Sequence, residues 1–179
     1  AASELITGHP QADCRLVRRL SHAKVQGTPV TRIYFAGIAM TVFGRHPERS
    51  LEDLAGEALI RALADAGCTA QQIGVAYYSG MTNGTLQGQI SIPGQVIFSK
   101  IGIEGIPVYN VENACASGSS AFNLAVQSLK AGTADVALAI GAEKMNIPDK
   151  AKAFAIFEGG WDVSRAEQNA ATLMKMGEG

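Results

Sequence analysis

Residues 106–132 read IPVYNVENACASGSSAFNLAVQSLKAG. The residues at 106–111 are mostly apolar and predict a short strand. Small residues surround Cys115, and a helix is expected over Ser117–Ala131. Gly132 fits the left-handed position at which many helices end. The stretch therefore predicts a strand, a tight turn that carries Cys115, and a helix, in that order.

The segments on either side continue this alternation. Strands are expected over 32–42, 73–79 and 136–140, and helices over 51–66 and 89–101. Residues 136–140 are apolar without alternation, which is typical of a strand buried on both faces. The helix at 51–66 has Ser50 as its N-cap, Asp53 in its first turn and Gly67 at its end.

The order βαβαβαβ calls for a mainly parallel sheet with right-handed crossovers and helices on both faces. The expected fold class is therefore α/β. Residues 1–30 are interpreted as an irregular leader and 31–146 as the α/β domain. From 147 to 179 the pattern loosens, with helices expected over 150–157 and 164–176 and no closing strand.

Composition excludes several classes of function. Of the 179 residues, 47% are apolar and 17% charged, and the net charge is −1, so neither disorder nor a nucleic-acid partner is indicated. No apolar run is long enough for a membrane span, and no secretory signal is present, which favours the cytoplasm. Cysteines 14, 68 and 115 fit neither a disulfide framework nor a zinc pattern, so no metal site is predicted.

Cys115 has the position of a reactive thiol. Ligands bind at the carboxyl ends of parallel strands, and the amides and dipole of a helix N-terminus favour a thiolate. The same amides can hold the oxyanion of a thioester carbonyl. Position alone fits a packed cysteine in a Gly/Ser-rich turn equally well, because free cysteine is among the most buried residue types.

Two motifs extend the evidence around Cys115. Residues 113–121, NACASGSSA, resemble the nucleophile motif of the thiolase superfamily, in particular the sterol-carrier-protein-2-type thiolases. Residues 132–145, GTADVALAIGAEKM, are similar to that family's segment G-x-x-D-V-A-L-x-x-G-x-E-K-M. The likeness runs from about 31 to 146, so the chain resembles the N-terminal half of an acetyl-CoA acetyltransferase-like thiolase. Residues 147–179 would then begin the loop domain that covers coenzyme A.

The resemblance implies a site and a reaction. Cys115 would be the nucleophile that carries the acyl group as a thioester, and Asn113, Ser117 and Gly118 would contact substrate. Coenzyme A would be a substrate, and no cofactor is expected. The reaction would be thiolysis of a 3-oxoacyl-CoA or the reverse Claisen condensation. The family pattern also implies a homodimer, with strand 106–111 near the interface.

The family's acid–base residues are not recognisable here. They lie in a second half with an Asn-containing loop, a Gly-His-Pro motif and a second cysteine, and nothing after residue 146 resembles them. Gly8-His9-Pro10 has the three letters but lacks the glycine-rich context. Cys14 and Cys68 are interpreted as bystanders. The chain is therefore expected to be a fragment, or a subunit that a second polypeptide completes.

Alternatives remain open from the sequence. A ketosynthase-type condensing enzyme also has a cysteine at a strand-to-helix turn, although Glu143-Lys144-Met145 fits the thiolase branch better. A non-catalytic subunit that binds acyl-CoA is a second alternative. Glu143 and Lys144 are expected to order a loop rather than to do chemistry. A peroxisomal targeting signal is resembled by Arg15-Leu16 followed, after five residues, by His22-Ala23. The peroxisome is therefore an alternative compartment.

Overall fold

The computed structural model describes residues 24–25, 28–29 and 32–177. Within the expected leader it contains only a short antiparallel pair, β1 (Lys24–Val25) and β2 (Thr28–Pro29). The predictions for Gly8-His9-Pro10, for Cys14 and for the targeting signal at 15–23 lie outside the described residues.

A parallel sheet of three strands forms the centre of the domain. It consists of β3 (Val75–Ser79), β4 (Val108–Val111) and β5 (Ala137–Gly141), in the order β4-β3-β5. Tyr77 of β3 lies opposite Tyr109 on one side and Ala139 on the other. Every residue of β3 is buried, as expected for a central strand.

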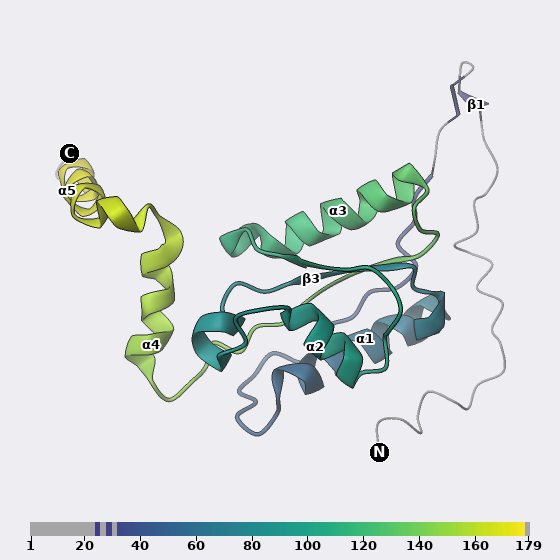
Figure 1. The fold of residues 1–179 in the computed structure, drawn as a ribbon, viewed down its shortest axis with the longest axis horizontal. Coiled ribbons are helices and arrows are strands. Elements are labelled where there is room, and N and C mark those ends of the chain that lie inside the picture. Colours follow the sequence, from purple (N-terminus) through teal and green to yellow (C-terminus); the bar gives the residue numbers. More distant parts are fainter. Residues whose placement is uncertain (1–23, 26–27, 30–31, 178–179) are drawn as a thin grey trace.

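Helices cover both faces of this sheet (Figure 1). The helices α1 (Leu51–Ala66) and α2 (Pro93–Lys100) lie on one face, and α3 (Ser117–Ala131) lies on the other. Successive residues of β3 point to opposite faces. Tyr78 therefore packs with Phe98 in the larger core cluster, whereas Tyr77 packs with Ala121 and Ala125 in the smaller one. The predicted α/β fold, with a parallel sheet between helices, is confirmed.

Local signals place the ends of the helices well. Ser50 accepts a hydrogen bond from the Asp53 amide at 3.1 Å, and the Asp53 carboxylate accepts one from the Ser50 amide at 2.8 Å. Gly67 and Gly132 adopt the left-handed conformation, with φ of 62° and 70°. Pro93 opens α2 at a position where its missing N–H costs nothing, although the helix is shorter than the expected 89–101.

The strand predicted over 32–42 is wrong. This segment belongs to no sheet, and α1 satisfies part of its backbone instead. The Ile38 amide donates to the Asp65 carboxylate at 2.9 Å, and Arg61 donates to the Met40 carbonyl at 3.0 Å. Gly37 permits this approach, since a Cβ there would lie 2.3 Å from the Ala62 carbonyl oxygen.

The predicted double burial of the strand at 136–140 is also wrong. Ile140 is the only buried residue of β5. The reason is that β5 is an edge strand of the described sheet. Its outer edge borders a cleft rather than another strand.

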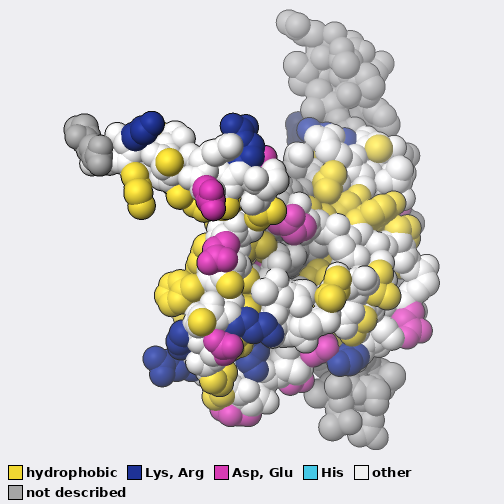
Figure 2. Space-filling view, turned by 60° about the vertical axis from the view of Figure 1, so that its left-hand side comes forward, with side chains coloured by type: hydrophobic (Ala, Val, Ile, Leu, Met, Phe, Trp, Pro, Cys, Tyr) yellow, Lys and Arg dark blue, Asp and Glu magenta, His cyan; other side chains and the backbone are white. Residues whose placement is uncertain are grey.

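The C-terminal part forms an arm that stands away from the sheet (Figure 1). It contains α4 (Lys150–Ala155), the 3-10 turns Ile156–Gly160 and Val163–Arg165, and α5 (Ala166–Gly177), so the expected helices are present. None of these elements has a buried residue, and Figure 2 shows apolar side chains exposed along the arm. Across the described ranges, no helix has the length and hydropathy needed to cross a bilayer.

The Cys115 turn, a candidate active site

Cys115 lies in the turn between β4 and α3. β4 ends at Val111, a 3-10 turn covers Ala114–Ala116, and α3 begins at Ser117. The thiol is free and exposed. This position is at the carboxyl end of a parallel strand, where open α/β sheets bind ligands.

The residue before the cysteine has an unusual backbone. Ala114 has φ of 46°, and within the described ranges Ile92 is the only other non-glycine residue with positive φ. The left-handed region costs an L-residue roughly 1–2 kcal/mol, because Cβ approaches the following carbonyl oxygen. Surrounding contacts must therefore hold Ala114 in this conformation.

Hydrogen bonds to the backbone surround Ala114. The Ser117 hydroxyl accepts from the Asn113 amide at 2.8 Å and donates to the Ala114 carbonyl at 2.7 Å. The Ala114 amide donates to the Glu112 carboxylate at 2.7 Å. The Ser117 side chain is therefore engaged on both sides of the strained residue.

The four predicted site residues lie close together, Asn113 and Cys115 in the turn and Ser117 and Gly118 at the start of α3. The Asn113 side chain is exposed, and its amide donates to the Ser120 hydroxyl at 2.9 Å. Gly118 is exposed, and a Cβ added to it would meet nothing within 4 Å. Ser117 is 6% exposed, with its hydroxyl directed at backbone atoms. The substrate-binding roles of Asn113, Ser117 and Gly118 stay predictions.

The start of α3 suits a negative charge. No side chain among the described residues caps this helix, and Ala116 occupies the N-cap position. The first turn, 117–120, contains no acidic residue. Backbone N–H groups at such an end favour an anion, so the arrangement can stabilise a thiolate and an oxyanion formed from a thioester.

Glu143 and Lys144, which follow β5, hold neighbouring loops through hydrogen bonds, as expected from the sequence. The Glu143 carboxylate accepts from the Met81 amide at 2.5 Å and from the Thr82 amide at 3.3 Å, and also from the Thr82 hydroxyl. The Lys144 ammonium donates to the Pro47 carbonyl at 3.0 Å and to the Arg49 carbonyl at 2.5 Å.

Sequence reasoning missed a buried polar pair beneath these loops. The Tyr78 hydroxyl donates to the Asn83 side chain at 2.7 Å, and Asn83 is 2% exposed. Burial raises the pKa of Tyr78 well above its ordinary value, so this hydroxyl remains a donor. A polar residue within the glycine-rich stretch 80–88 was the only sequence signal of this contact.

No described histidine lies in the segment 112–120 around Cys115. His46 is the only histidine in the described part of the chain, and its Nε2 lies 2.9 Å from the Val42 carbonyl in the turn before α1. No group of three His, Cys, Asp or Glu side chains is placed to hold a metal among the residues that the structure describes.

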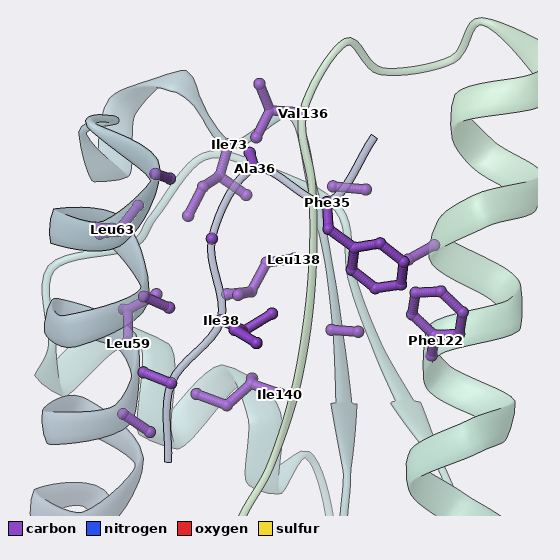
Figure 3. Close-up of a pocket in the computed structure, with 18 of the residues that line it drawn as sticks. Phe35, Ala36, Ile38, Leu59, Leu63, Ile73, Phe122, Val136, Leu138 and Ile140 are labelled. Atoms are coloured by element: carbon purple, nitrogen blue, oxygen red, sulfur yellow. The ribbon is translucent and has the colours of Figure 1, made fainter. Parts of the chain in front are cut away.

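A large apolar cleft lies away from the nucleophile. Figure 3 shows this cleft, of about 790 Å³, between the segment 33–41, β5, α1 and α3, with Ile38, Leu59 and Leu138 in its wall. None of its lining residues belongs to the turn 112–120. A second cleft, of about 530 Å³, is lined by Gly80, Asn83 and Glu112. This second cleft follows the carboxyl ends of β3 and β4 and reaches the Cys115 turn at Glu112, although Cys115 itself does not line it.

Two solved structures from Xanthomonas species have a similar fold. The chain aligns with OleA of Xanthomonas campestris at a TM-score of 0.51 and 19% identity, covering 62% of this chain and 32% of that one. It aligns with 3-oxoacyl-(acyl carrier protein) synthase III of Xanthomonas oryzae at a TM-score of 0.50 and 20% identity, covering 70% and 37%. At this level of identity, the likeness concerns the fold alone.

Sequence relatives are more specific. The chain is 37% identical to sterol carrier protein 2 of Gallus gallus over 116 residues, which are 64% of this chain and 20% of that protein. It is 36% identical over 114 residues to benzoylsuccinyl-CoA thiolase subunit BbsB of Thauera aromatica, covering 63% and 28%. It is 39% identical over 109 residues to acetyl-CoA acetyltransferase of Methanocaldococcus jannaschii, covering 61% and 28%.

These matches show that the chain spans between a fifth and just over a quarter of the length of these relatives. The sequence profile of one family, described as "Thiolase, N-terminal domain", matches residues 33–176 and so covers most of the chain, including Cys115. The fold of the sheet and helices agrees with this match, and the chain therefore belongs to the thiolase N-terminal domain family.

Proposed function

We propose that this chain supplies the acyl-accepting part of a thiolase-type acyl-CoA C-acyltransferase, with Cys115 as the nucleophile. The observation that carries the proposal is an exposed free thiol on a strained turn, immediately before an uncapped helix N-terminus. Two relatives whose names contain thiolase or acetyltransferase support this assignment. We assign substrate contacts to Asn113 and Gly118, and the exposure of both residues near Cys115 supports this assignment.

The proposed step is a thioester exchange. The Cys115 Sγ attacks the carbonyl carbon of acyl-CoA, and a new C–S bond forms as the bond to the coenzyme A sulfur breaks. The proton from the Cys115 thiol ends on the departing coenzyme A thiolate. Backbone N–H groups at the start of α3 would stabilise the oxyanion in between. Coenzyme A is thus a substrate and not a retained cofactor.

The complete reaction needs acid–base groups from elsewhere. His46 is engaged in the turn before α1, and the turn 112–120 contains no histidine. We assign the base to polypeptide outside these residues, either a further part of a longer chain or a second polypeptide. With that part, the assembly would catalyse 3-oxoacyl-CoA thiolysis or the reverse condensation, as a homodimer with β4 near the interface.

Acyl transfer to the thiol is the direct test. The purified chain is incubated with acetyl-CoA, and the peptide that contains Cys115 is analysed by mass spectrometry. We expect one acetyl group on Cys115, and at least about a thousandfold less acetylation in Cys115→Ser, because a hydroxyl without a base is a poor nucleophile. Acetylation that persists in Cys115→Ser, or none in the wild type, contradicts the proposal. Transfer from acyl carrier protein in preference to acyl-CoA would favour a ketosynthase-type enzyme.

A non-catalytic subunit is the second candidate. It is favoured by the absence of a histidine from the turn and by a relative that is itself named as a thiolase subunit. Binding of acetyl-CoA without transfer, together with thiolysis that appears only after a second polypeptide is added, would support this candidate.

For the compartment, we propose the cytoplasm, and the peroxisome is the alternative. Deletion of residues 1–30 from a fluorescent fusion tests the alternative, because a peroxisomal location that depends on the signal would then be lost.

A further inference from the structure

The backbone at Ala114 decides where the Cys115 thiol lies. A residue with φ of 46° turns the chain sharply between Asn113 and Cys115. An alanine has no preference for this region, because its Cβ meets the following carbonyl oxygen. Another group must therefore hold the turn. Ala114 bonds two side chains, the exposed Glu112 carboxylate through its amide and the buried Ser117 hydroxyl through its carbonyl.

One side chain connects both flanks of the strained residue. The Ser117 hydroxyl accepts from the Asn113 amide at 2.8 Å and donates to the Ala114 carbonyl at 2.7 Å. Ser117 as a whole is only 6% exposed, which limits the access of water that would compete for the same bonds.

The neighbouring serines lack this arrangement. The Ser119 side chain is exposed, and its hydroxyl donates only to the Ala116 carbonyl, at 2.9 Å. The Ser120 hydroxyl accepts from the side chain of Asn113, not from its backbone. Ser119 is therefore a matched control, being a serine in the same helical turn without a contact to Ala114.

We propose that Ser117 is a positioning residue that holds Ala114 in the left-handed conformation and so aims Cys115 from the end of α3. The inference rests on the proposed function of Cys115. Without the hydroxyl, the Asn113 amide loses its acceptor and Ala114 relaxes toward the right-handed or extended region. That change rotates the following residues and moves the thiol away from the N–H groups of the helix.

The experiment measures the reactivity of Cys115 and needs no partner polypeptide. The rate of carbamidomethylation by iodoacetamide is determined near neutral pH from the mass of the Cys115 peptide, in the whole 179-residue chain. We expect Ser117→Ala to lower this rate on the order of tenfold, a change typical of losing one or two buried hydrogen bonds. Ser119→Ala should react at the wild-type rate.

A second substitution separates positioning from general stability. Glycine adopts positive φ without a steric penalty. Ala114→Gly should therefore raise the rate more in the Ser117→Ala background than in the wild-type background. If Ser117 only stabilised the fold, the added glycine would not restore the rate of carbamidomethylation, because glycine increases the conformational freedom of the unfolded chain.

Ala114→Val provides an independent arm that leaves Ser117 intact. Valine is strongly disfavoured at positive φ, so this exposed substitution should slow carbamidomethylation even if Ser117→Ala does not fold. The inference is overturned if Ala114→Val reacts like the wild type, or if the double variant reacts no faster than Ser117→Ala. If wild-type Cys115 reacts no faster than in the urea-unfolded chain, the proposed function of Cys115 fails instead.

Discussion

Two helix N-termini in this domain are built in opposite ways. At α1, Ser50 and Asp53 form a reciprocal pair of hydrogen bonds that satisfies backbone N–H groups with the helix's own side chains. At α3, Ala116 occupies the equivalent N-cap position, and no described side chain caps the helix. The first helix end is thus closed by its own side chains, whereas at the second the Ser117 amide bonds the Ala114 carbonyl and no side-chain cap is made.

Charge follows the same division. The first turn of α1 contains Glu52 and Asp53, which complement the helix dipole. The first turn of α3 contains no acidic residue, and the nearby Glu112 carboxylate accepts from the Ala114 amide. Glu112 thus supplies one negative charge just before α3, and the remaining N–H groups of the first turn itself, 117–120, can receive the Cys115 thiolate or an oxyanion. If Cys115 acts as proposed, the missing side-chain cap at α3 serves the thiol rather than the stability of the helix.

A third helix gives an intermediate case. At α2, the Gly94 amide donates to the Asn110 side chain of β4 at 2.7 Å, so the helix end is closed by another element. A Cβ at Gly94 would lie 2.7 Å from the Tyr78 Cβ and 2.8 Å from the Asn110 oxygen. We expect Gly94→Ala to lower the free energy of unfolding by about 1–3 kcal/mol through overpacking, measured by urea denaturation.

Asn110→Ala is the companion to that variant, because it removes the acceptor without adding volume. It should lower the free energy of unfolding by less than Gly94→Ala does. Equal losses would mean that the hydrogen bond, and not the close packing, dominates at this helix end. Unchanged stability in Gly94→Ala would contradict the close approach of α2 to the sheet.

Removing the cap of α1 should affect stability alone. Ser50→Ala eliminates the acceptor for the Asp53 amide, and such changes cost about 1 kcal/mol. We expect the urea midpoint to fall with an unchanged slope, while the rate of Cys115 carbamidomethylation stays at the wild-type value. A slower reaction at Cys115 would show that the two helix ends are coupled and would break the comparison.

The same cap should also depend on pH. Hydrogen bonds from the Ser50 amide and side chain hold the pKa of Asp53 below its ordinary value of 3.8. A lowered folded-state pKa contributes stability above the unfolded pKa, and this contribution is lost as the pH falls through the folded value. The stability difference between the wild type and Asp53→Asn should therefore shrink as urea titrations move from neutral pH to below 3.8. A difference that stays constant would exclude the capping carboxylate as its source.

Sequence patterns predicted the features that depend only on residues close together in the chain, such as the ends of helices. The ends of α1 and α3 follow from Ser50, Gly67 and Gly132, whose effects act within one turn of the chain. The strand expected at 32–42 failed because pairing requires a partner strand, and its amides and carbonyls contact Asp65 and Arg61 of α1 instead. The burial of β5 was overestimated for the same reason, since apolar composition does not specify what lies on each edge.

The site shows the same limit. Cys115 was found from its motif, and Asn113, Ser117 and Gly118 from their place beside it. The strain at Ala114 could not be predicted, because alanine itself gives no signal for positive φ. It arises from the buried Ser117 hydroxyl, whose two contacts exist only once the turn is folded.

The sharpest test converts the open helix end into a closed one. Ser119 is the third residue of α3, the position that Asp53 has in α1. Ser119→Asp places a fixed carboxylate in the first turn, where it competes with the Cys115 thiolate for the dipole and repels it. We expect carbamidomethylation to slow about twofold to fivefold, in line with the roughly 0.3–1 kcal/mol of such dipole interactions, and thermal stability to be unchanged or slightly higher.

Ser119→Asn is the neutral control for this change, because it has nearly the same shape without the charge. It should react close to the wild-type rate, and the gap between the two variants should narrow in roughly 0.5 M salt, which screens exposed charges. If Ser119→Asp and Ser119→Asn are equally reactive, the start of α3 exerts no electrostatic control over the thiol. The missing cap would then have no bearing on Cys115, and the difference between the two helix ends would concern stability alone.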